Sequence, residues 1–113
     1  MLRIVDVRRA LAVRGYPRDL SGRLVIAVTD PLLAHNTGRF AVEVTNGCAG
    51  IGKVGDEEPA GLTLGIASLA SLYSGHTGVL RLQQTGLLHG EPASITLAAR
   101  LFHNGYPWMT DRF

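Results

Sequence analysis

The chain has 113 residues, enough for one hydrophobic core and too few for two, so residues 1–113 are expected to form a single domain. It is 46% hydrophobic and only 18% charged, which excludes a disordered chain and indicates surface that a partner covers. The net charge of +2 arises from ten arginines and one lysine scattered among acidic residues, and only 6% of the chain is aromatic. A nucleic-acid-binding surface normally carries a denser basic stripe with interleaved aromatic residues, so no nucleic-acid partner is expected.

Cysteine content and hydropathy bear on whether the protein is secreted or inserted in a membrane. Cys48 is the single cysteine, so an internal disulfide is impossible and nothing indicates secretion. No apolar run approaches 18 residues, and the opening sequence MLRIVDVRR lacks the hydrophobic segment of a signal peptide. The sequence therefore predicts neither a membrane span nor a secretion signal.

The first half of the chain has the pattern of a sheet with one helix. A continuous apolar run at residues 24–29 predicts a strand covered on both faces, and residues 38–46 alternate between apolar and polar side chains. Asn46-Gly47 is a strong signal for a hairpin turn, and Asp6 is a candidate N-cap for the helix that follows it. Strands are expected at residues 2–5, 24–29, 38–46, 48–54 and 62–64.

The second half of the chain predicts helices. Apolar residues recur at helical spacing over residues 66–73. Thr77 is expected to cap a short second helix, and Pro92 opens a third helix at its first turn. In that third helix Leu97 and Leu101 fall outside the main apolar stripe, which indicates a face buried by something beyond the domain. The predicted order is a strand, a helix, several strands and then helices. This order is typical of an α+β fold.

A glycine-rich run resembles a nucleotide-binding motif only in part. Residues 47–53, GCAGIGK, fit the first seven positions of a phosphate-binding loop. Val54 stands where that loop needs Ser or Thr, and three acidic residues follow at 56–58, where a helix would have to begin. Carboxylates there would repel phosphate, so the run is interpreted as the return strand of a hairpin.

No cluster of chemistry-bearing residues is evident in the sequence. The four histidines, each without a Cys, His or Asp neighbour at metal-ligand spacing, are His35, His76, His89 and His103. Cys48, beside a turn, is interpreted as a small hydrophobic residue rather than a nucleophile. The sequence therefore predicts no metal site and no self-contained active site.

The C-terminal end is unusual because it carries large apolar residues, including Trp108 and the last residue, Phe113. Chain termini are normally small and polar. Anchoring of this end would hold the terminal α-carboxylate at a defined place, where it could act as a general base or bind a cation. The alternative from the residues alone is a tail that packs on its own sheet.

Four segments together resemble a known family: LRIVDVRRALAVRGYP at the start, LTLGIASLASLYSG, the turn TGLLHG and the ending LF…PW…F. In this order and spacing they resemble the C-terminal domain of the Eis-like acetyltransferases of the GNAT superfamily. That domain has the sterol-carrier-protein (SCP2-like) fold. The resemblance implies a mostly antiparallel sheet of about five strands covered by three to four helices. It also implies that residues 1–113 are the last part of a larger protein.

The resemblance implies a role within a larger enzyme. Eis-like proteins have two acetyltransferase-like domains before this one, assemble as hexamers and transfer acetyl groups from acetyl-CoA to amines such as aminoglycosides. The acetyl-CoA loop and the general acid lie in the first of those domains, so this chain is expected to bind no cofactor and to be inactive alone. The family's terminal carboxylate acts as the catalytic base, a role that falls on the C-terminus of Phe113. Arg112 is a departure, because a cation beside that carboxylate would repel a cationic acceptor if it faced the same pocket.

Two further hypotheses remain open. Free-standing proteins of the same fold carry lipids, so an apolar ligand in a tunnel is the alternative function. A structural role, in which the domain forms an oligomer interface, is compatible with either. The family and the missing signals indicate the bacterial cytoplasm, and Met1 begins the chain where the domain should follow its partner domains, as in an excised fragment or a shortened gene product.

Overall fold

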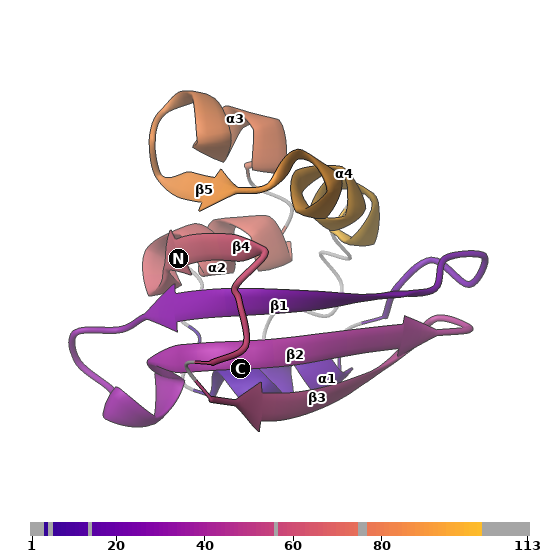
Figure 1. Cartoon of the computed structure of the whole chain (residues 1–113), viewed down its shortest axis with the longest axis horizontal. Helices are drawn as coiled ribbons and strands as arrows, with labels where there is room; N and C mark the ends of the chain where they lie inside the picture. Colours follow the sequence, from indigo (N-terminus) through magenta and orange to yellow (C-terminus); the bar gives the residue numbers. More distant parts are fainter. Residues whose placement is uncertain (1–3, 5, 14, 56, 75–76, 103–113) are drawn as a thin grey trace.

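A computed structural model describes residues 4, 6–13, 15–55, 57–74 and 77–102 of the chain. Its centre is a five-stranded sheet with the strand order β3-β2-β1-β4-β5 (Figure 1). Neighbouring strands are antiparallel except for β1 and β4, which are parallel. The elements are α1 (Val7–Val13), β1 (Gly22–Thr29), the 3-10 helix η1 (Ala34–Asn36), β2 (Gly38–Thr45), β3 (Cys48–Val54), β4 (Leu62–Gly65), α2 (Ile66–Ser74), α3 (Val79–Gln84), β5 (Leu88–Gly90) and α4 (Pro92–Leu101).

The N-terminal helix begins where the sequence predicts. The Asp6 carboxylate accepts a hydrogen bond from the Arg9 backbone N–H at 3.1 Å, which satisfies one of the donors that a helix start leaves open. The strand predicted at residues 2–5 is not formed at Ile4, which is fully buried but lies in no strand. The other residues of that prediction lie outside the described part.

The hairpin between β2 and β3 confirms the turn prediction. Asn46 and Gly47 have φ values of 53° and 83°, the left-handed pair that a tight two-residue turn requires. The alternation in β2 buries Phe40, Val42 and Val44 on one face. Leu24 and Ile26 of β1 lie opposite Val42 and Phe40 and extend the same apolar face.

The opposite face of the sheet is crossed by the connection from β3 to β4, which passes in front of β2 and β1 in Figure 1. Arg23 on β1 and Glu58 in this connection form an ion pair that joins the two. Val25 and Ala41, which are paired neighbours on this face, are buried at 7% and 5% exposure. The predicted burial of β1 on both faces is therefore confirmed at its centre.

The C-terminal half corrects two sequence predictions. Thr77 does not cap α3; the N-cap residue is Gly78, which makes no side-chain cap hydrogen bond. The short strand β5 was not predicted and pairs with β4, so it takes the fifth place that residues 2–5 were expected to fill. Helix α4 has Glu91 as its N-cap residue and proline in its first turn, as predicted.

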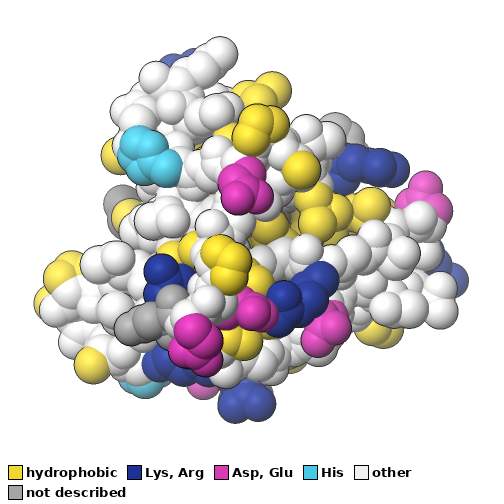
Figure 2. Space-filling model, in the orientation of Figure 1, with side chains coloured by type: hydrophobic (Ala, Val, Ile, Leu, Met, Phe, Trp, Pro, Cys, Tyr) yellow, Lys and Arg dark blue, Asp and Glu magenta, His cyan; other side chains and the backbone are white. Residues whose placement is uncertain are grey.

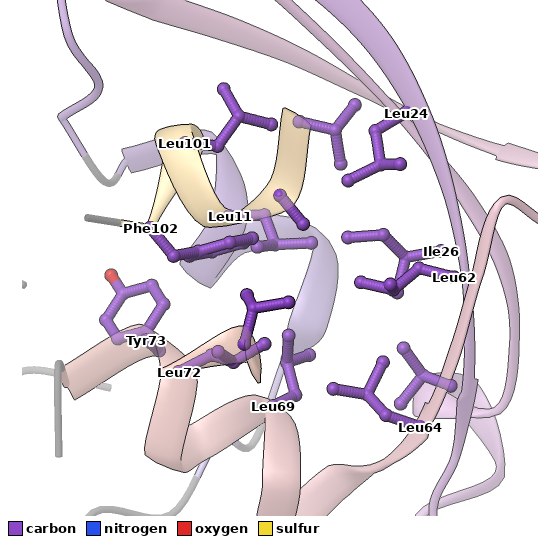
Figure 3. Close-up of a cluster of buried hydrophobic side chains, with 14 of the residues drawn as sticks. Leu11, Leu24, Ile26, Leu62, Leu64, Leu69, Leu72, Tyr73, Leu101 and Phe102 are labelled. Atoms are coloured by element: carbon purple, nitrogen blue, oxygen red, sulfur yellow. The ribbon is translucent and has the colours of Figure 1, made fainter. Parts of the chain in front are cut away.

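One hydrophobic cluster joins the inward face of the sheet to all four α-helices. Figure 3 shows Leu11 of α1, Leu69 and Leu72 of α2 and Leu101 of α4 converging on Ile26 and its neighbours in the sheet. Burial of aliphatic side chains on this scale is the main force that holds such a domain together. The α+β prediction, with five strands and four α-helices, is confirmed.

Two glycines of the sheet differ in what surrounds them, and this gives a stability test. A Cβ on Gly90 would lie 2.6 Å from the Gly61 carbonyl oxygen, whereas a Cβ on Gly52 would meet nothing within 4 Å. Gly90→Ala is expected to lower the free energy of unfolding by about 1–3 kcal/mol through overpacking. Gly52→Ala is expected to raise it by about 0.5–1 kcal/mol, because alanine loses less chain entropy in a strand. Urea unfolding of the two variants measures both effects, and equal destabilisation would contradict the packing described.

Candidate functional site

The end of α4 fixes the point from which the C-terminal tail departs. The Phe102 backbone N–H donates to the Ala98 carbonyl at 3.0 Å, and the Phe102 side chain is buried at 5% exposure. Its ring meets the Tyr16 ring edge-on, with centroids 6.3 Å apart. The Tyr16 hydroxyl donates in turn to the Leu11 carbonyl at 2.8 Å. Phe102, the last described residue, is therefore held in the core by its backbone hydrogen bond and by its ring contact with Tyr16.

The predicted catalytic group lies beyond that point. Phe113, like Arg112, Trp108 and Pro107, lies outside the described residues. Eleven residues follow Phe102. A fully extended chain of that length spans up to about 36 Å. The domain measures 30 × 29 × 28 Å, so a tail of this length is long enough for the terminal carboxylate to reach beyond the domain.

The glycine-rich run at residues 47–53 is part of a hairpin, as the sequence analysis concluded. It begins in the tight turn and continues as β3, which pairs with β2 over its whole length. The Lys53 ammonium lies 5.6 Å from the centroid of the Phe40 ring. The described residues after it enter a turn, so the helix that a phosphate-binding loop requires does not follow this run.

The other candidate residues do not converge on a site. His35 and His89 are exposed, and His76 and His103 lie outside the described residues. Among the residues that the structure describes, no group of three or more His, Cys, Asp or Glu side chains could hold a metal ion. Cys48 is exposed at the start of β3.

A buried polar network lies at the end of β1, and sequence reasoning did not find it. Asp30 and Asn36 are 4% and 0% exposed. The Asn36 amide donates to the Asp30 carboxylate at 3.0 Å, and its oxygen accepts from the Val7 backbone N–H at 2.9 Å. Asn36 therefore bonds to the first residue of α1, Val7, although the two residues are 29 positions apart in the sequence. A pattern of neighbouring residues does not reveal such a contact. The network is structural, because these hydrogen bonds join groups of the fold to one another.

The ion pair on the outer face is partly exposed. The side chains of Arg23 and Glu58 are 47% and 34% exposed, so solvent screens their attraction. The hydrogen bond from Arg23 to Glu58 raises the pKa of the guanidinium above its ordinary value, so the group stays charged throughout the neutral range. Basic and acidic side chains are intermixed on the face shown in Figure 2.

The second apolar face predicted for α4 belongs to the domain's own core. Leu101 is only 1% exposed within the main cluster. Leu97 is partly buried, and its side chain lies 3.3 Å from where a Cβ on Gly22 would stand. These two leucines therefore pack against β1 and the other helices, and they do not indicate a partner surface.

Comparison with known proteins identifies the family. A profile described as "Sterol carrier protein domain" matches residues 7–110, and the chain belongs to this family. An uncharacterized N-acetyltransferase from Streptomyces griseus is 38% identical over 114 residues, which cover 99% of this chain and 26% of that protein.

Solved structures give the same result. A GCN5-related N-acetyltransferase from Anabaena variabilis is similar with a TM-score of 0.86 and 38% identity, over 93% of this chain and 26% of that one. Eis1 from Mycobacterium abscessus is similar with a TM-score of 0.76 and 34% identity, over 91% of this chain and 25% of that one. The chain thus spans about a quarter of the relatives that it matches, and the resemblance to an Eis-like terminal domain is confirmed.

Proposed function

We propose that this chain is the terminal domain of an acetyl-CoA-dependent N-acetyltransferase, in which it supplies a catalytic carboxylate and is inactive alone. The observation that carries the proposal is the difference in length between this chain and the proteins that it matches. The whole described fold superimposes on N-acetyltransferases at 38% identity, yet it accounts for 26% of the matched chain. A domain retained with this identity beside a larger catalytic part is expected to serve the reaction of that part.

The proposed chemistry requires a base. An amine acceptor is cationic at neutral pH and has to lose a proton before it attacks the acetyl thioester. The C-terminal carboxylate of Phe113, within hydrogen-bond reach directly or through one water, would accept that proton. Support comes from the fixed departure point at Phe102 and from the length of the tail. Acceptors such as aminoglycosides are polycationic, so Arg112 is expected to face away from them.

The partners follow from the same proposal. Acetyl-CoA would bind the preceding acetyltransferase domains, where the family resemblance places the acetyl-CoA loop. The parent protein would be a homo-oligomer, a hexamer by its family, in the bacterial cytoplasm. Among the described residues, no helix has both the length and the apolar character needed to cross a membrane.

A lipid carrier is the second candidate, favoured by the description of the matching family. Its apolar ligand would occupy space between the sheet and the helices. There the side chains of Leu11, Leu62, Leu69 and Phe102 converge on one another in the core (Figure 3). The aliphatic side chains that suggested a lipid tunnel thus largely pack against one another in the core.

Acetyl transfer by the protein purified from its own cells tests the proposal. With acetyl-CoA and a panel of amines that includes aminoglycosides, release of free CoA is expected, and the isolated 113-residue chain is expected to release none. Native mass spectrometry of the same preparation tests the alternative. A co-purified lipid, together with no CoA release from any amine, would contradict the acetyltransferase proposal and favour the carrier.

A further inference from the structure

The turn between β2 and β3 presents a chemically reactive pair of residues to solvent. Asn46 is exposed, and among the described residues it is the only one other than glycine with a positive φ, at 53°. Gly47 follows it with a φ of 83°. When glycine follows asparagine, the glycine nitrogen can attack the asparagine side-chain amide, because no side chain hinders the approach.

The two groups that would react are free of competing hydrogen bonds. Among the described residues, none accepts a hydrogen bond from the Gly47 backbone N–H, and none is hydrogen-bonded to the Asn46 side-chain amide. Rotation about the bond between Cα and the carbonyl carbon of Asn46 brings the Gly47 nitrogen to that amide. Such a rotation requires only the tip of the hairpin to open, which costs little free energy where the residues are exposed.

The fold nevertheless requires glycine at position 47. A Cβ on Gly47 would lie 3.0 Å from the Tyr16 carbonyl oxygen and 3.1 Å from Cγ of Arg18. The Gly47 carbonyl oxygen also accepts a hydrogen bond from the Tyr16 backbone N–H at 3.1 Å. Since the Tyr16 ring contacts Phe102, a change in this turn is transmitted through Tyr16 toward the end of α4.

We propose that Asn46 is a site of spontaneous deamidation, and that one of its two products loosens the β2–β3 hairpin. The Gly47 nitrogen gives up its proton to solvent and forms a bond to Cγ of Asn46. The bond from Cγ to the side-chain nitrogen breaks, and ammonia leaves. Water then opens the cyclic imide at one of its two carbonyl groups, which leaves aspartate or isoaspartate at position 46.

The two products differ in what they do to the turn. Aspartate adopts the left-handed conformation almost as readily as asparagine, so it keeps the two-residue turn. Isoaspartate carries the main chain through its Cβ and so adds one backbone atom to the turn. The Gly47 carbonyl then moves away from the Tyr16 N–H. This effect is independent of the proposed function, because it concerns the fold alone.

Peptide mass mapping of the purified chain, aged at neutral pH with and without urea, tests the reaction. Cleavage after Arg and Lys places Asn46 in the peptide 40–53 and Asn36 in the peptide 24–39. Asn104-Gly105 has the same sequence as the turn, lies outside the described residues and falls in a separate peptide. The ratio of the folded to the unfolded rate is expected to be at least about tenfold higher at Asn46 than at Asn36, which is buried and hydrogen-bonded.

The contrary result is equally clear. No conversion of Asn46 in the folded chain, over a period in which the unfolded chain converts completely, would overturn the proposal. Asn46→Asp cannot lose ammonia, so the same peptide of this variant should show no gain in mass.

Hydrogen exchange tests the effect of the isoaspartate product. After chromatographic separation of the two aged forms, the Tyr16 N–H is expected to exchange about tenfold faster in the isoaspartate form, because its hydrogen bond to Gly47 is lost. In Asn46→Asp the same N–H should exchange within about twofold of its rate in the unsubstituted chain. Equal Tyr16 exchange in the isoaspartate form and the unsubstituted chain would overturn the loosening of the hairpin.

Discussion

Two glycines added after Phe113 in the full-length protein are expected to lower kcat for acetyl transfer by roughly 10²–10⁴-fold, the contribution of a positioned general base. The extension keeps a terminal carboxylate but displaces it by up to about 7 Å along the chain. A base displaced by that distance no longer reaches the amine proton. KM for acetyl-CoA should change little, because the cosubstrate is expected to bind the other domains.

Two matched variants identify the group responsible. Phe113→Leu retains the terminal carboxylate at its place and is expected to keep kcat within a few-fold of the unsubstituted protein. A semisynthetic C-terminal amide removes the negative charge without lengthening the chain and should reproduce the loss caused by the extension. Unchanged turnover in the amide would exclude the carboxylate as the base, whatever the effect of the extension.

Replacing Asn36 with leucine should lower the free energy of unfolding by about 3 kcal/mol or more. Leucine has nearly the shape of asparagine but offers no polar atom, so the Val7 N–H loses its acceptor at 2.9 Å. The buried Asp30 carboxylate loses the Asn36 amide, one of its donors, at 3.0 Å and keeps the backbone N–H groups of Leu32 and Leu33. A buried polar group left without its partner costs about 1–3 kcal/mol, and a charged one costs more. Urea unfolding of the chain measures the change.

A substitution in the same 3-10 helix supplies the control. Because His35 has interactions of its own, Ala34→Ser is the control instead. Ala34 lies in the same 3-10 helix and is exposed, and its replacement should change the unfolding free energy by no more than about 0.5 kcal/mol. Asn36→Asp adds a pH test, because it places a second carboxylate beside Asp30. Like charges raise the pKa of such a pair in the folded state, so this variant should gain stability as the pH falls through that raised value. A pH-independent loss would contradict the contact described.

The strands with a regular pattern could be predicted from sequence, because side-chain alternation and turn chemistry act locally. The left-handed pair Asn46-Gly47 defines the β2–β3 hairpin by itself. β5 could not be predicted, because its three residues, Leu88–Gly90, form a strand only through pairing with β4. The prediction at residues 2–5 was wrong at Ile4, which is fully buried but lies in no strand.

Helical spacing predicted which elements are helices better than which of their side chains are buried. Leu80 lies in the second predicted helix and is 60% exposed, whereas Val79 and Leu82 of α3 are buried. Leu101 was assigned to a partner face and is 1% exposed within the domain. Helical spacing gives neither result, because the direction from which a helix is covered depends on tertiary packing.

The candidate site could be predicted only through the family. Composition and spacing correctly predicted that the glycine-rich run at residues 47–53 is the return strand of a hairpin. The assignment of Phe113 came from the resemblance and stays a prediction, since that residue lies outside the described part of the chain. The Asp30–Asn36 network depends on contacts between distant segments, and no local sequence signal would have revealed it.

The mass of the native product tests the central claim most directly. An antibody against this domain, applied to an extract of the source cells, is expected to detect a protein roughly four times heavier than 12.1 kDa, since the chain is 26% of its matched relative. That result would place the domain within a larger enzyme. A single band at 12.1 kDa would contradict the account, because a domain that works alone would have no acetyl-CoA-binding partner in its own chain.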